Sequence, residues 1–213
     1  MTSEELLLPF EGLRKERELI GKMLLAYNEL EYVLLDMLIA VLGDGQAAIR
    51  AMYQLRSEAN RLAVAEAIIT PEFTRSALGG SLKESLDALG HCKAIRNQFA
   101  HCLWTFDEGT LRFANLELTA KSKGEKCQVV SHPLTATLLR NQWAYFEYAS
   151  HMLLWVNQEY RRKNNQSLHG SIIPKPKRLP PPKLHSRGEP RTRHSTFVGR
   201  WRLKPKQPPT AHS

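Results

Sequence analysis

Apolar residues recur at intervals of three, four or seven along most of the first 162 residues, with polar residues between them. This spacing places the apolar side chains on one face of an α-helix. Gly43-Asp44-Gly45, Thr70-Pro71 and Gly79-Gly80 interrupt the pattern and separate its segments. The sequence therefore predicts four main helices, at residues 11–42, 46–69, 81–103 and 133–162.

The first predicted helix is long, and it carries a second apolar seam at Leu35, Ile39 and Leu42. Two apolar stripes imply contacts on two sides of the helix. We therefore expect this helix to lie at the centre of a bundle or to be shared with a second subunit.

Local signals predict where the other helices begin and end. Pro71 should end the second helix, because the residue before a proline is pushed out of the α region. Ser81, with Glu84 at capping-box spacing, is the predicted N-cap of the third helix. Pro133 is compatible with the first turn of the last helix.

Between residues 103 and 130 the pattern changes to short alternating runs. The runs 103–106 and 110–113 flank Asp107-Glu108-Gly109, which is a typical hairpin signal, and residues 127–130 can add a third short strand. We therefore predict an all-α fold, a bundle of four to five helices with a small β-hairpin inserted before the last helix.

The composition changes at residue 164, where proline and basic residues become frequent and apolar residues rare. Such a segment buries too little apolar surface to offset the entropy of ordering. The sequence thus predicts one helical domain at 1–163 and a disordered Pro/Lys/Arg-rich tail at 164–213. One apolar island in this tail can dock on the body or on a partner, or is a chance cluster: Phe197, Val198, Trp201 and Leu203.

The net charge of +9 is unevenly distributed. Residues 161–213 hold 14 Lys/Arg and one acidic residue, a net charge of +13, which leaves 16 Lys/Arg and 20 acidic residues, a net charge of −4, in residues 1–160. Attraction to polyanions such as RNA therefore belongs mainly to the tail. Its prolines also suit polyproline II recognition by a partner protein.

The three cysteines, Cys92, Cys102 and Cys127, are odd in number and lack the paired spacing of a structural zinc site. Reduced thiols in the cytoplasm fit best. The N-terminal residues resemble no signal peptide, and no apolar run approaches the roughly 20 residues of a membrane-spanning helix. We expect a cytoplasmic protein with no membrane partner, no cofactor and no bound metal.

Within the third predicted helix, Arg96-Asn97 precedes His101 by four to five residues. Asn97 and His101 should lie one turn apart on the same face, and the long stem of Arg96 can bring its guanidinium round to them. Arginine neutralises charge on phosphoryl oxygens, histidine moves protons at neutral pH, and asparagine orients either group. These three residues therefore suit phosphodiester chemistry. The 2′-hydroxyl of RNA can act as the nucleophile without a metal.

This Arg-Asn-x-x-x-His pattern in a small helical bundle resembles the HEPN (higher eukaryotes and prokaryotes nucleotide-binding) superfamily, as does the run Tyr27-Asn28-Glu29-Leu30-Glu31 in the long first helix. The resemblance implies a metal-independent endoribonuclease that works as a homodimer, with Arg96 and His101 of both subunits lining one cleft and Asn97 in support. Toxin-type members carry tyrosine where this chain has Leu103, so the resemblance is to the superfamily and not to that class. A regulatory protein partner stays open as an expectation, and the sequence does not identify it.

Other interpretations of these residues stay open. The superfamily also contains noncatalytic RNA-binding and protein-interaction modules, and a helical scaffold with a tethering tail is a third possibility. His101 can be a structural histidine that shares hydrogen bonds with Asn97, and Arg96 can pair with an acid such as Glu29 or Glu31. His91 and Cys92 are interpreted as packing or surface residues. One aromatic residue of the last helix can stack a base, although core positions are favoured for Trp143, Tyr145, Phe146 and Tyr148.

Overall fold

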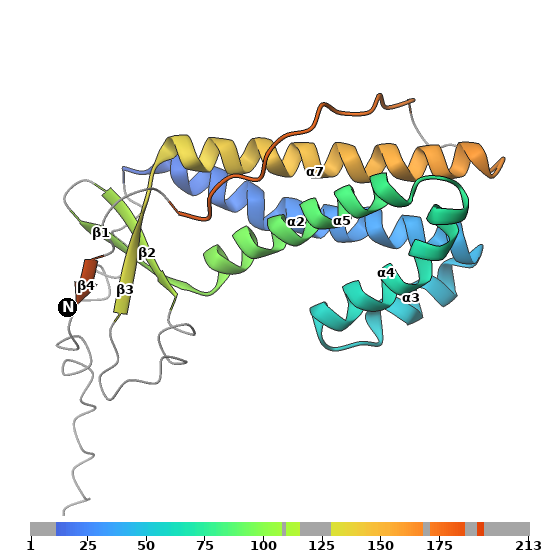
Figure 1. The fold of residues 1–213 in the computed structure, drawn as a ribbon. Helices are drawn as coiled ribbons and strands as arrows, with labels where there is room; N and C mark the ends of the chain where they lie inside the picture. The colour runs from blue at the N-terminus through green and yellow to red at the C-terminus, as the bar shows by residue number, and fades with distance from the viewer. Residues whose placement is uncertain (1–11, 108–109, 116–128, 168–170, 186–190, 194–213) are drawn as a thin grey trace, which may run out of the picture.

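The computed structural model describes residues 12–107, 110–115, 129–167, 171–185 and 191–193. Among these residues, three long helices lie side by side, two shorter helices cover one end of the bundle, and a small sheet stands at the other end (Figure 1). The helices are α2 (Arg14–Leu42), α3 (Gly45–Tyr53), α4 (Glu58–Arg75), α5 (Gly79–Ala100) and α7 (Ala136–Lys163). The strands are β1 (Cys102–Asp107), β2 (Thr110–Asn115), β3 (Val129–Leu134) and β4 (Arg191–Arg193). The predicted helical bundle with a small sheet before the last helix is confirmed.

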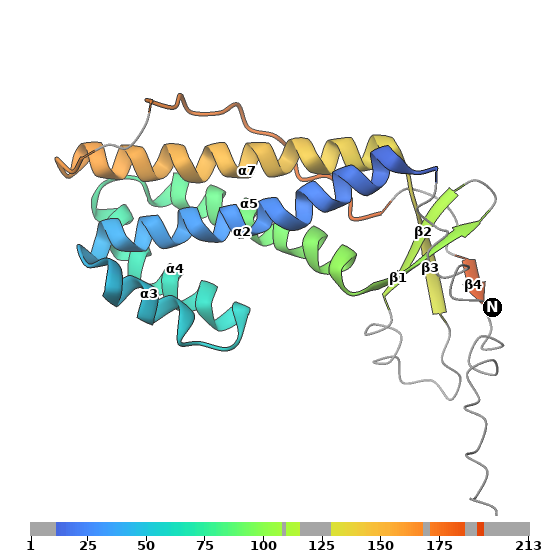
Figure 2. The ribbon, with the colours of Figure 1, turned by 180° about the vertical axis from the view of Figure 1, so that it is seen from behind.

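Helix α2 is the central element, as its two apolar stripes predicted. It packs against α7 along its length and also touches α3, α4 and α5, an arrangement that Figure 2 shows from behind. Tyr27, Leu34 and Leu38 are fully buried between these neighbours. The helix ends at Gly43, which adopts a left-handed φ of 69° and donates its N–H to the Ile39 carbonyl at 2.8 Å.

The second predicted helix is two helices in the structure. Asp44 caps α3 by accepting the N–H groups of Gln46 and Ala47 at 2.8 and 3.2 Å, and the chain breaks again before α4. The prediction that Pro71 ends the helix is wrong, because α4 continues to Arg75. The last turn is held by Phe73, which is fully buried and stacks on Tyr160 of α7 with ring centroids 4.3 Å apart. The stacking of Phe73 on Tyr160 offsets the loss of the backbone hydrogen bond that Pro71 cannot donate.

Both predicted ends of the third helix are also wrong. Its N-cap is Leu78, not Ser81, and Glu84 accepts a 2.8 Å hydrogen bond from Tyr148 of α7 where a capping box was expected. The helix stops at Ala100, three residues before the predicted end, because Cys102 already pairs with Asn115 in the sheet. Strand pairing requires an extended backbone and so overrides the helical periodicity.

The predicted hairpin is part of a larger antiparallel sheet in the order β1-β2-β3-β4. The two expected strands are β1 and β2, whereas the third forms at Val129–Leu134 and residues 127–128 lie outside the described residues. Pro133 belongs to β3, opposite Arg112, and not to the last helix; Thr135 caps α7 by accepting the Leu138 N–H at 3.2 Å. Phe113 meets Phe99 edge to face, which anchors the sheet on α5.

Part of the predicted disordered tail follows a defined path on the body. Residues 171–185, here called the strap, return from the C-terminal end of α7 along that helix to the sheet (Figures 1 and 2). The expectation of disorder is therefore wrong for the strap and for β4, whereas residues 168–170, 186–190 and 194–213, with the apolar island, lie outside the described residues. No helix in the described part of the chain is long and apolar enough to cross a membrane.

Candidate functional site

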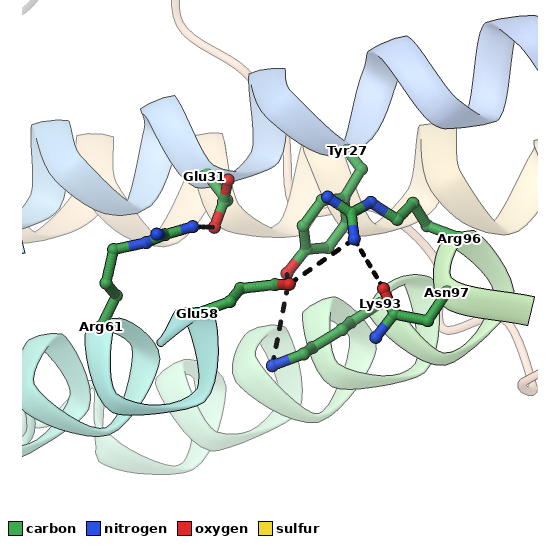
Figure 3. Close-up of polar contacts among 7 residues, drawn as sticks. All are labelled: Tyr27, Glu31, Glu58, Arg61, Lys93, Arg96 and Asn97. Atoms are coloured by element: carbon green, nitrogen blue, oxygen red, sulfur yellow. Dashed lines mark hydrogen bonds and ion pairs between the residues drawn. The ribbon is translucent and has the colours of Figure 1, made fainter. Parts of the chain in front are cut away.

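Arg96 and Asn97 lie on the face of α5 that is turned toward α2 and α4 (Figure 3). Arg96 donates from a terminal guanidinium nitrogen to Asn97 Oδ1 at 2.7 Å. Its guanidinium also lies over the ring of Tyr27 on α2, 5.2 Å from the ring centroid, in a cation–π contact. The structure thus brings Arg96 and Asn97, two of the three predicted site residues, into direct contact and orients the guanidinium toward Tyr27 and α4.

A carboxylate that sequence reasoning missed organises this region. Glu58, the first residue of α4, accepts a 2.6 Å hydrogen bond from the Tyr27 hydroxyl. Its two oxygens lie 3.6 Å from Lys93 Nζ and 3.6 Å from an Arg96 nitrogen, respectively (Figure 3). The side chains of Lys93, Arg96 and Glu58 are 21%, 26% and 19% exposed, so the cluster is accessible from solvent. An acid in the first turn is also favoured by the helix dipole.

The charges of this cluster do not cancel. Burial first, and then the hydrogen bond to Glu58, raises the pKa of Tyr27 far above its usual value, so its phenol stays protonated and acts as the donor. One carboxylate therefore faces two cations, Lys93 and Arg96. The cluster keeps a net positive charge of about one, which suits an anionic group such as a phosphate.

Beside this cluster a second ion pair joins α2 to α4. Arg61 donates to Glu31 at 3.3 Å, and its guanidinium lies 5.7 Å from the centre of the Tyr53 ring. The prediction that Arg96 pairs with an acid of the first helix is therefore wrong: Glu31 is used by Arg61, and the partner of Arg96 is Glu58. The idea of an ion pair at Arg96 was right, but its partner comes from another helix.

His101 is not on the helix as predicted but is its C-cap, with its backbone N–H 3.3 Å from the Asn97 carbonyl. Its side chain is exposed, and among the described residues it makes no hydrogen bond or ion pair. The hydrogen bond that His101 shares with Asn97 is thus from backbone to backbone, and among the described residues none joins their side chains. The imidazole is instead open to solvent at the junction of α5 and β1.

The remaining candidates have structural roles. His91 bonds the Pro182 carbonyl of the strap at 2.8 Å, and Cys92 is buried, which raises the pKa of its thiol to about 12. Burial also raises the pKa of Cys102 to about 12, while Cys127 lies outside the described residues. Within the described ranges, no three His, Cys, Asp or Glu side chains gather into a possible metal site.

Comparison with protein-family models, curated proteins and solved structures found no match to this chain. Two residues of the cluster have a signal in the sequence that could have predicted them. Tyr27 belongs to the run Tyr27-Asn28-Glu29-Leu30-Glu31, and Lys93 shares a helix face with Arg96 at i,i+3 spacing. Glu58 had no sequence signal, because 38 positions separate it from Arg96 and only the packing of α4 on α5 joins them.

Proposed function

We propose that this protein is a HEPN-like, metal-independent endoribonuclease that acts on RNA through Arg96, Asn97 and His101. One observation carries the proposal: α5 bears both Arg96, which is held in a net-positive cluster, and His101 at its C-terminal end. The His101 imidazole is exposed and has no hydrogen-bond or ion-pair partner among the described residues. A phosphodiester needs these two components, a cation for its oxygens and a group that moves protons.

The chemistry follows from these groups. The 2′-oxygen of a ribose attacks the adjacent phosphorus, the bond from phosphorus to the 5′-oxygen breaks, and a 2′,3′-cyclic phosphate and a 5′-hydroxyl result. One proton leaves the 2′-hydroxyl and one arrives at the 5′-oxygen. His101 serves as the base or the acid in these transfers, while Arg96 stabilises the charge on the phosphoryl oxygens. Asn97 keeps the guanidinium in place.

The proposal includes a homodimer. Within one copy, no contact among the described residues joins the side chains of Arg96 and His101. Two copies that place their α5 ends together would provide two imidazoles, one for each proton transfer. Light scattering tests this part of the proposal, and a monodisperse monomer at micromolar concentration would contradict the shared site.

The activity assay uses structured RNA in EDTA with the full chain. We expect cleavage by the wild type and a loss of about 100-fold or more in rate for His101→Ala and for Arg96→Ala. His151→Ala is the matched control, because His151 is an exposed histidine on α7, on another element. RNA left intact over a range of salt concentrations, or equal cleavage by all the variants, would refute the enzyme proposal.

A noncatalytic HEPN-like module that binds RNA or a protein is the second candidate. It is favoured by the contacts of Arg96 with Glu58 and Asn97. A guanidinium whose N–H groups are already paired has fewer of them left to stabilise the charge on a phosphoryl oxygen in the transition state. This candidate predicts RNA binding without cleavage, weakened by Arg96→Ala and unaffected by His101→Ala. Binding measured by fluorescence anisotropy in EDTA, beside the cleavage assay, separates the two candidates.

A further inference from the structure

In the described part of the chain, the hydrogen bonds between the body and the strap all use the strap's backbone. Gln142 on α7 donates to the Lys183 and Leu184 carbonyls at 2.9 and 3.2 Å, and Gln98 on α5 donates to the Leu184 carbonyl at 2.7 Å. With these, the hydrogen bonds to the strap backbone number six in the described part of the chain. The other three are from His91 to the Pro182 carbonyl, from Gln158 to the Ser171 carbonyl, and from the Ile173 N–H to Gln158 Oε1.

These bonds suit an extended, proline-rich chain. A polyproline II segment has no internal hydrogen bonds, so its carbonyls are available to side-chain donors. Proline also reduces the entropy lost on docking, and five of the 15 strap residues are prolines. The α5–α7 surface beneath the strap, here called the groove, therefore presents amide and imidazole groups where such a chain needs partners: His91, Gln98, Gln142 and Gln158.

The side chains of the strap add a charge preference. Lys175 lies over the ring of Trp155 on α7, 4.9 Å from its centre, and Arg178 lies 3.6 Å from Glu84 on α5. Beside Arg178 a pocket of about 470 Å³ opens between the strap and the two helices. Its lining includes Tyr145 and Tyr148 and two ion pairs, Lys83–Asp87 and Arg178–Glu84. A segment with larger side chains here would make further contacts.

We propose that the α5–α7 groove is a binding site for a basic, proline-rich, extended segment of another polypeptide, and that the strap is its resident competitor. None of the six hydrogen bonds uses a strap side chain, so another segment of this conformation can form all of them. Because the strap follows α7 in the same chain, its effective concentration at this surface is on the order of millimolar. A partner binds when it outcompetes this tethered segment. The proposal does not depend on RNA cleavage.

The probe for this site is a fluorescein-labelled synthetic peptide of residues 171–185, and the receptor is the full chain. In one receptor variant Pro180, Pro181 and Pro182 are all changed to glycine, which weakens the strap without altering the groove. We expect the peptide to bind this triple-glycine variant at least about tenfold more tightly than the wild type, measured by anisotropy. Equal affinity for both receptors would overturn the proposal.

Groove variants in the triple-glycine background locate the binding. Gln158→Ala and Gln142→Leu each remove side-chain hydrogen bonds and should weaken the peptide by roughly tenfold, whereas Asn141→Ala, an exposed neighbour, should change nothing. Thermal melts confirm that each receptor variant is folded. Unchanged peptide affinity in both glutamine variants would overturn the proposal.

A second peptide, with alanine at every proline, should bind the triple-glycine receptor more weakly than the probe does. Exchange of straps between two copies, seen as a dimer that the peptide dissociates, would support it.

Discussion

Glu58 is the residue that sets the charge of the candidate site. Its carboxylate accepts a hydrogen bond from the Tyr27 hydroxyl and lies close to Lys93 and Arg96. One negative charge therefore orients two cations and leaves a net positive charge of about one. A hydrogen bond to a charged acceptor contributes about 1.5–3 kcal/mol to stability. The same contacts that position Arg96 for a phosphate therefore also join α2, α4 and α5.

The Tyr27 hydroxyl gives this network a dependence on alkaline pH. Its pKa is raised in the folded protein, so above about pH 10 the unfolded chain releases this proton and the folded chain keeps it. Stability contributed by the protonated phenol is thus present below pH 10 and is lost as the pH rises toward the folded-state pKa. We expect Tyr27→Phe to destabilise the protein by about 1.5–3 kcal/mol at pH 8 and by about 1.4 kcal/mol less at pH 11.

Urea unfolding at the two pH values measures this difference. Tyr32→Phe is the matched control, because Tyr32 lies on the same helix and is 67% exposed. It should have little effect at either pH. A cost of Tyr27→Phe that stays constant between pH 8 and pH 11 would contradict the assigned role of the phenol.

At the scale of the element, Gly21 inside α2 and Gly43, which caps its C-terminus, should respond oppositely to alanine. A Cβ added at either Gly21 or Gly43 would meet nothing within 4 Å, so the backbone conformation alone decides the outcome. Gly21→Ala should stabilise the helix interior by about 0.5–1 kcal/mol, whereas Gly43→Ala should cost about 1 kcal/mol because φ is 69° there. Urea denaturation of the two variants measures both changes, and shifts of the same sign would contradict the prediction.

Pro71 is a second local conflict within a helix. It lies exposed inside α4, where proline is about 3 kcal/mol less favourable than alanine, although proline also restricts the unfolded chain by up to about 1 kcal/mol. We expect Pro71→Ala to raise the free energy of unfolding by about 1–3 kcal/mol in urea denaturation. Thr70→Ala, at the adjacent exposed position, should change it far less. A loss of stability in Pro71→Ala would show that α4 requires the proline.

At the scale of the whole molecule, the strap changes where the positive charge lies. The strap fixes Lys175, Lys177, Arg178 and Lys183 on the surface of the body, although by sequence they belong to the basic tail. Half of the fourteen Lys/Arg residues in 161–213 lie before residue 186, and the other seven follow it. The body therefore carries more of the attraction to polyanions than the sequence indicated.

Truncation after His185 tests this distribution. The shortened chain should still bind single-stranded RNA, but log affinity should fall less steeply with log salt, because each phosphate contact contributes a slope of about 0.7. Anisotropy titrations over a series of KCl concentrations measure the slope. A full-length chain with the same seven cations changed to glutamine is the matched control and should behave like the truncation. An unchanged slope, or complete loss of binding, would contradict the prediction.

Agreement between sequence and structure was good where a signal was local and repeated. The long α2 helix, its glycine end and the β1–β2 hairpin were predicted correctly, since each depends on a periodicity or a turn within a few residues. The errors at Pro71, Ser81 and Pro133 have a common cause. At each, a correct local preference was outweighed by a contact from a distant part of the chain, such as the stacking of Phe73 on Tyr160 or the pairing of Pro133 with Arg112.

The sequence by itself determined a helical bundle with a small sheet before its last helix, the uneven charge, and Arg96, Asn97 and His101 as the residues suited to a phosphodiester. Only the tertiary structure decided that Glu58 pairs with Arg96, that His101 is exposed at the end of α5, and that the strap lies on the body. The reason is physical: helices and turns depend on neighbours along the chain, whereas an ion pair across 38 positions or a docked carbonyl depends on how the helices pack.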